Sequence, residues 1–145
     1  MNPEEEYIQD VLRRLSRNFQ GRLIFAGILD ESAKLIHFQK GEVVFRLAFN
    51  RQAALDVQVS LAADLARQFE DFAGSLLHLV ITYKDCEVII MSILRNSTLY
   101  VICTRGASAG ISDMLTKMAE NSPEKRPGSI SSHQQEFIED EWSGQ

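Results

Sequence analysis

The chain has 145 residues, enough for one domain with a proper core, and its 45% hydrophobic content is typical of a globular protein. The net charge of −5 and the pI near 5.2 argue against a broadly basic, nucleic-acid-binding face. No apolar run approaches the roughly 20 residues that a membrane-spanning helix needs. The acidic start at residues 4–6 is unlike a secretory signal, so we expect a cytoplasmic protein.

A first helix is predicted over residues 4–19, with Asn2 as its N-terminal cap. Its apolar residues recur at spacings of three and four, so they share one face of the helix. These residues are Ile8, Val11, Leu12, Leu15 and Phe19.

Two strands, residues 22–29 and 34–39, are predicted to form a hairpin around a turn at residues 30–33. Gly27 inside the first strand indicates a bulge or a close backbone contact. The apolar segment 42–49 fits either an extra strand or the lead into the next helix, and its pattern does not decide between them.

A long helix is predicted over residues 51–72, capped by Asn50 and ended by Gly74. One stripe of large apolar side chains runs along it, formed by Val57, Leu61, Leu65, Phe69 and Phe72. Small side chains flank that stripe at Ala54, Ala62, Ala66 and Ala73. Because small residues allow close approach, the flank suggests a second contact surface beside a core-facing one. A single wide buried face is the alternative.

Residues 76–103 contain three apolar, β-branched runs separated by polar breaks at residues 84–85 and 95–97. Such runs predict an antiparallel meander. The middle run, residues 88–91, does not alternate apolar with polar, which indicates a strand covered on both faces. A short helix follows, with Ser108 as its expected cap and an apolar stripe at Ile111, Met114, Leu115 and Met118.

The composition changes at Asn121. Residues 121–145 are rich in Ser, Pro, Glu and Gln and hold five acids and two bases. We therefore divide the chain into a domain, residues 1–120, and a flexible acidic tail, residues 121–145. Near its end the tail carries Phe137, Ile138 and Trp142, which could dock on a partner or on a groove of the domain itself. An inert, solvated tail is the alternative.

No catalytic or metal-binding constellation can be named from the sequence. The histidines His37, His78 and His133 are isolated, and no Cys-x-x-Cys pair is present. Cys86 and Cys103 are interpreted as small buried thiols. The glycine-containing loop 104–110 precedes a helix and could receive an anion, but an ordinary strand-to-helix connection is the favoured interpretation. We expect no enzyme activity, no cofactor and no metal.

The order of these elements resembles the roadblock / dynein light-chain family, a small α/β fold of the profilin-like type. The likeness rests on the hairpin FAGILDESAKLIHF, residues 25–38, and on the meander and following helix, residues 77–118. It covers residues 7–120 and looks especially like an archaeal branch of roadblock-like proteins. Segment 41–50 departs from it, being more apolar than the turn expected there. The resemblance implies a three-layer α/β sandwich, with a five-stranded, mostly antiparallel sheet between one long helix and two shorter helices.

The resemblance also implies self-association. Roadblock-like domains generally dimerise by packing their long helices together and pairing their first meander strands across a two-fold axis. An unpaired apolar sheet edge is a liability that an isologous dimer resolves. We therefore expect a homodimer whose interface contains Val57, Ala62, Leu65, Ala66, Phe69, Leu77, Leu79 and Ile81.

The family's usual role implies a non-enzymatic interaction or scaffold module that binds or regulates a small Ras-like GTPase, with the acidic tail tuning that surface. One alternative is a profilin-like sensor that holds a small ligand in a cavity beside the meander, lined by His37, Tyr83 or Arg105. Another is a purely structural subunit of a larger assembly. An enzyme is least favoured, because no nucleophile–base pair can be named. We expect neither nucleic acid nor a membrane as a partner.

Overall fold

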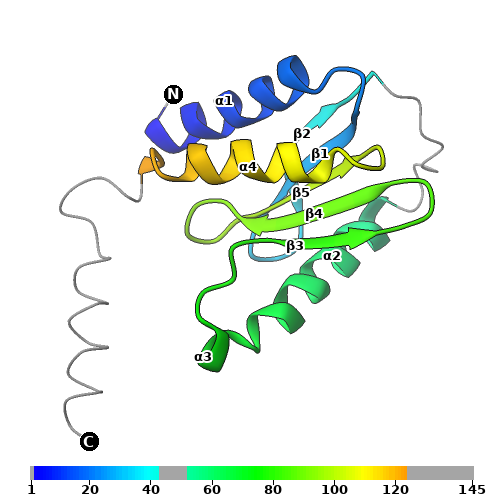
Figure 1. Ribbon diagram of the computed structural model, residues 1–145. Coiled ribbons are helices and arrows are strands. Elements are labelled where there is room, and N and C mark those ends of the chain that lie inside the picture. The colour runs from blue at the N-terminus through cyan, green and yellow to red at the C-terminus, as the bar shows by residue number, and fades with distance from the viewer. Residues whose placement is uncertain (1, 43–51, 124–145) are drawn as a thin grey trace, which may run out of the picture.

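The structure is a computed structural model that describes residues 2–42 and 52–123 (Figure 1). One antiparallel sheet has the strand order β2-β1-β5-β4-β3, so β2 and β3 are its edges. The predicted hairpin and meander are therefore both confirmed. The strands are β1 (Leu23–Leu29), β2 (Leu35–Lys40), β3 (Leu79–Thr82), β4 (Glu87–Ser92) and β5 (Thr98–Cys103).

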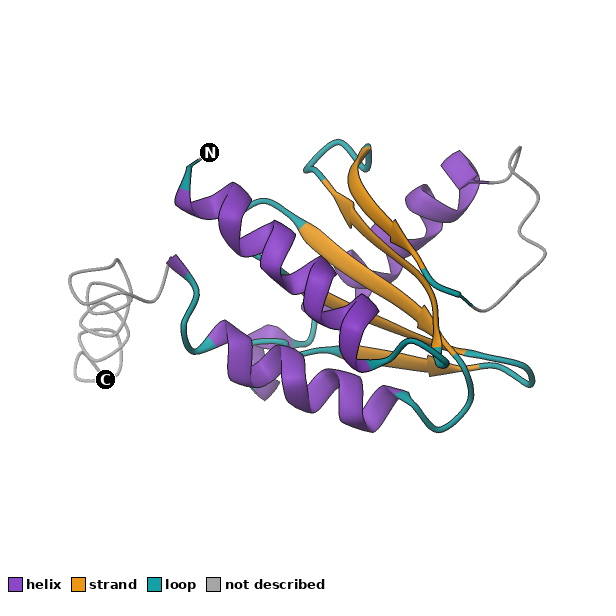
Figure 2. Cartoon of the chain, turned by 90° about the horizontal axis from the view of Figure 1, so that it is seen from above, coloured by secondary structure: helices purple, strands orange, loops and turns teal. Residues whose placement is uncertain are grey.

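Helices cover both faces of the sheet. α1 (Pro3–Asn18) and α4 (Ser108–Ala119) lie side by side on one face, and α2 (Gln52–Arg67) covers the other (Figure 1, Figure 2). This is the predicted three-layer α/β architecture. The predicted long helix is broken after Arg67, and a single further turn, α3 (Glu70–Ala73), follows. α2 and α1 consequently have the same length, 16 residues.

α1 begins where the sequence predicts. The Oδ1 atom of Asn2 accepts the backbone N–H of Glu5 at 2.8 Å, and three glutamates occupy the first turn, where the helix dipole favours negative charge. The buried face consists of Ile8, Val11, Leu12 and Leu15, as the spacing indicates. That face holds α1 against the sheet.

Two hydrophobic cores lie on opposite faces of the sheet, and the central strands contribute to both. In β4, Ile89 packs toward α1 and α4, whereas Ile90 packs toward α2. In β5, Val101 packs toward α1 and α4, and Tyr100 packs toward α2. Because successive strand residues point to opposite faces, a strand covered on both sides must be apolar throughout. This confirms the interpretation of the non-alternating run at residues 88–91.

Contacts within the β1–β2 hairpin and with β5 explain the residues found at its turn and at Gly27. The Oδ1 atom of Asp30 accepts the backbone N–H groups of Ser32 and Lys34, at 2.8 and 3.0 Å. Gly27 lies opposite Tyr100, and a Cβ atom at Gly27 would lie 2.7 Å from a carbon of the tyrosine ring. The close approach at Gly27 is therefore to side chains, whereas the sequence indicated a bulge or a close backbone contact.

Some predictions fall on residues that the structure does not describe. They concern the apolar segment from residue 43 onward with Asn50, and the tail from residue 124 onward with Phe137, Ile138 and Trp142. Within the described ranges, no helix combines the length and apolarity needed to cross a membrane.

Candidate functional site

The side of α2 that faces the sheet is fixed by a buried polar network. Asp56, Val59 and Ala63 are buried, with exposed fractions of 5% or less. The hydroxyl of Tyr100 donates to Oδ1 of Asp56 at 2.8 Å, and Nε2 of Gln52 donates to both, at 2.9 Å to Asp56 and 2.7 Å to Tyr100. Burial, and then the Asp56 carboxylate, raise the pKa of Tyr100, so its hydroxyl stays protonated and continues to donate. The network sets which side of α2 points outward.

The opposite side of α2 is a continuous apolar surface, here called the outer stripe. Residues of an α-helix are about 100° apart, so Val57, Leu61 and Leu65 point away from the sheet. The exposed rings of Phe69 and Phe72 extend the stripe beyond α2 and meet edge to face, with centroids 5.6 Å apart. The exposed fraction is 49% for Val57, 57% for Leu61, 62% for Leu65, 59% for Phe69 and 79% for Phe72. The outer stripe is therefore a candidate interaction surface.

The outward orientation excludes one of the two alternatives that the sequence left open, a single wide buried face. The other alternative was a second contact surface, and the expected dimer interface already contained Val57, Leu65 and Phe69 of the large stripe. In the structure the large residues face outward, whereas Ala62 and Ala66 are half-buried at the border between the stripe and the sheet. The physical reason is that Asp56 must reach Tyr100, and this polar requirement outweighs the greater apolarity of the other side.

Strand β3 forms the free sheet edge next to α2. Among the described strands it pairs only with β4, which confirms the predicted edge, although β3 is shorter than the predicted strand at residues 76–83. Leu79 and Ile81 are half-buried and pack into the core beneath α2. Leu77 precedes the strand and is 71% exposed. The backbone groups along the outer side of β3 can pair with another strand.

The predicted interface residues fall into two groups, one on α2 and just after it, and one on β3 and just before it, with β3 packed against the core beneath α2. The helix group is Val57, Ala62, Leu65, Ala66 and Phe69, and the edge group is Leu77, Leu79 and Ile81. Two well-exposed residues of the outer stripe, Leu61 and Phe72, were not among the predicted interface residues. Leu61 follows Val57 and precedes Leu65 at the four-residue spacing of one helix face, and this periodicity was the signal that could have included it.

The N-terminus of α4 is occupied by a carboxylate of the chain itself. Oε1 of Glu87 accepts the backbone N–H groups of Ser108 and Gly106, at 3.1 and 2.8 Å. These hydrogen bonds hold the pKa of Glu87 below its ordinary value of 4.5, so the group is ionised at neutral pH. Ala107, and not Ser108 as predicted, is the capping residue. The anion position of the loop 104–110 is therefore filled by Glu87, which ties β4 to α4.

The cysteines and the possible metal ligands form no further site in residues 2–42 and 52–123. Cys86 and Cys103 are buried free thiols, as interpreted from the sequence, and burial raises the pKa of Cys103 to about 12. No three His, Cys, Asp or Glu side chains in these ranges gather as metal ligands. Three open hollows of about 530, 510 and 360 Å³ are lined by residues other than His37, Tyr83 and Arg105. These hollows lend the sensor interpretation no support.

Comparison with solved structures gives the fold a name. The chain is similar to the Roadblock/LC7 domain from Streptomyces avermitilis, with a TM-score of 0.57 and 11% identity over 74% of this chain and 90% of that one. It is also similar to MglB with a tetrameric arrangement, with a TM-score of 0.58 and 13% identity over 83% of this chain and 93% of that one. For Myxococcus xanthus MglB the TM-score is 0.58, and the identity is 14% over 78% of this chain and 89% of that one. No protein-family model and no curated protein sequence matches the chain. The likeness to an archaeal branch stays a prediction. At these identities the likeness establishes the architecture: this chain has the Roadblock/LC7 fold.

Proposed function

We propose that the chain forms a homodimer through the outer stripe and the β3 edge. The observation that carries this proposal is an exposed apolar helix face close to a strand that, among the described strands, is paired on one side only. A two-fold axis beside β3 would join the two sheets into one and bring the two α2 helices side by side, with the alanine border and the adjoining part of each outer stripe between them. A second copy is the occupant that fits best, because it offers the same two features in a self-complementary arrangement. One relative of this fold is itself described in a tetrameric arrangement.

The proposed dimer is a non-enzymatic interaction or scaffold module that binds or regulates a small Ras-like GTPase. This part of the proposal rests on the Roadblock/LC7 fold and on the role that the resemblance implies. A purely structural subunit would use the same dimer without the GTPase, so the two roles are separated by a binding measurement.

The dimer is tested by reversing the character of the outer stripe. Light scattering of the unaltered protein at micromolar concentration should give about twice the chain mass of 16.4 kDa. Leu61→Glu with Leu65→Glu should give the monomer mass, because a buried unpaired carboxylate is strongly unfavourable. Ile36→Glu is the matched control, since Ile36 is a 42% exposed apolar residue on the opposite edge strand, β2.

Ala62→Glu and Ala66→Glu test the border of the interface and should also dissociate the dimer. A monomer mass for the unaltered protein would refute the proposal. If the leucine variant and both alanine variants all keep the dimer mass, the dimer forms through another surface.

The GTPase role is tested with the small Ras-like GTPases of the source cell, purified and loaded either with GDP or with a non-hydrolysable GTP analogue. Binding to the unaltered protein should be detected in at least one nucleotide state and should fall in the Leu61→Glu/Leu65→Glu variant. A stable dimer that binds no GTPase in either state would favour the structural-subunit role.

A further inference from the structure

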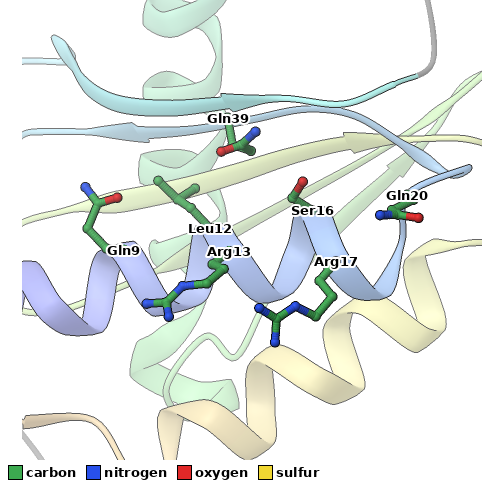
Figure 3. Close-up of a pocket in the computed structure, with 7 residues that line it drawn as sticks. All are labelled: Gln9, Leu12, Arg13, Ser16, Arg17, Gln20 and Gln39. Atoms are coloured by element: carbon green, nitrogen blue, oxygen red, sulfur yellow. The ribbon is translucent and has the colours of Figure 1, made fainter.

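A polar groove lies along α1 on the sheet face opposite to the outer stripe. Its volume is about 530 Å³, and it is lined by residues of α1, by Gln20 and by Gln39 of β2 (Figure 3). Figure 3 shows Gln9, Leu12 and Ser16 pointing from α1 toward Gln39. Leu12 is buried, so it contributes an apolar floor between amide and hydroxyl groups. Because α1 and α2 cover different faces, this groove is separate from the proposed dimer interface.

One border of the groove is basic. Arg13 and Arg17 extend from the side of α1 away from Gln39 (Figure 3). The Arg13 side chain is 60% exposed and lies 3.8 Å from its ion-pair partner Asp10, and Arg17 makes no ion pair with any described residue. The lining of the groove contains these two arginines and no acid, in a chain of net charge −5. The groove therefore attracts acidic segments.

The chain leaves the described domain beside this groove. Pro123, the last described residue, lines a second hollow of about 510 Å³ that shares Gln9 and Arg13 with the groove. Beyond it, residues 127–145 contain four acids and neither Lys nor Arg. These acids are Glu136, Glu139, Asp140 and Glu141.

The tail is long enough to return. Twelve residues, 124–135, separate Pro123 from Glu136. Fully extended they span up to about 40 Å, at roughly 3.4 Å per residue. The groove runs along α1 from Gln9 to Arg17, about 12 Å of helix, and continues to Gln20 just beyond the helix. A link of this length holds two parts of one chain at a high effective concentration, on the order of 1 mM, so even a weak contact is populated.

We propose that residues 136–142 dock in the α1–β2 groove of the same chain. The acidic side chains pair with Arg13 and Arg17, and the Trp142 ring packs against a guanidinium group and the apolar floor. The docked segment covers this face, so an acidic segment of a partner must displace it to reach the two arginines. The proposal does not depend on the dimer or on the GTPase.

Trp142 is the only tryptophan of the chain, so intrinsic fluorescence of the full-length protein reports on the tail alone. With an effective concentration at or above the dissociation constant, half or more of the tails are docked, and acrylamide quenching should be at least about two-fold weaker than in a free peptide of residues 132–145. The emission should also shift to the blue. Both signals should be independent of protein concentration, because the contact lies within one chain.

Charge reversal locates the contact. Arg13→Glu with Arg17→Glu should raise quenching to the value of the free peptide, while circular dichroism and the mass in solution stay unchanged. Lys84→Glu with Arg95→Glu is the charge-matched control, since both side chains are exposed in turns away from the groove, and it should leave quenching unchanged.

A compensating change sharpens the test. Glu139→Lys with Asp140→Lys, introduced into the Arg13→Glu/Arg17→Glu protein, should restore the protection of Trp142. Full quenching in the unaltered protein would overturn the proposal, as would protection that survives the arginine changes. Protection that disappears on dilution would place the tail on another copy, and protection lost only with Leu65→Glu would place it on the outer stripe. Either result would also overturn it.

Discussion

Gly27→Ala is a substitution whose effect can be worked out from the structure. A Cβ atom at Gly27 would lie 2.7 and 2.8 Å from two carbons of the Tyr100 ring and 2.9 Å from Cδ1 of Leu35. Relaxed carbon–carbon contacts are about 3.5–4.0 Å, so the ring would have to retreat by about 1 Å. Tyr100 has an exposed fraction of 0%. Its hydroxyl is held by two hydrogen bonds in the network with Asp56, so retreat breaks those bonds or displaces α2.

The expected cost follows from that geometry. Inserting a methyl group into a filled core costs about 1–3 kcal/mol, and weakening a buried hydrogen bond adds to it. We expect Gly27→Ala to lower the free energy of unfolding by about 2–3 kcal/mol, a large share of the roughly 5–15 kcal/mol of a typical domain. Urea unfolding followed by circular dichroism measures this as a shift of the midpoint to lower urea by about 1 M or more. Protein concentration is held fixed, because dimerisation contributes to stability.

Gly21→Ala is the matched control. Its added Cβ would meet no atom within 4 Å, and Gly21 does not have a positive φ angle. The substitution should leave stability unchanged or raise it by up to about 1 kcal/mol, through the lower entropy of the unfolded chain. If Gly27→Ala is as stable as the unaltered protein, the ring of Tyr100 is not held as we describe, and the reasoning is refuted.

The other predictions concern buried polar groups. Tyr100→Phe should lower the free energy of unfolding by about 1–3 kcal/mol in urea titrations, because the Asp56 carboxylate loses a donor, and unchanged stability would contradict the network. Glu87→Gln should destabilise the fold near neutral pH. Because folding lowers the pKa of Glu87 from 4.5, its contribution is fully present above that pH and is lost as the pH falls through the folded value, so the two proteins should converge in acid. If the stability difference between Glu87→Gln and the unaltered protein does not change with pH, the Glu87 carboxylate does not stabilise the fold in the way we describe. Cys86 and Cys103 should react with a thiol reagent only in denaturant, and rapid reaction of both in the native protein would show that they are not buried.

Local sequence determined most of the secondary structure. The β-branched runs and their polar breaks specify five strands, because extended backbone suits those side chains and the turn residues end each run. Asn2 and the acidic first turn specify the start of α1. The apolar β4 indicates cover on both faces, and the exposed place of β3 follows from its position at the start of the meander. Each of these signals acts between residues that are close in sequence.

Only the tertiary structure decided how the helices are turned and where surfaces meet. Periodicity shows that α2 has an apolar side, but which side is buried depends on Asp56 meeting Tyr100, 44 residues away. The carboxylate at the start of α4 comes from Glu87, 19 residues before Gly106. The basic groove is likewise lined by residues of α1 and by Gln39 of β2, which are far apart in the sequence. A polar group buried with its partner fixes one orientation, because the unpaired alternative costs more than exposing apolar side chains. That balance leaves the outer stripe on the surface, where a second copy can cover it.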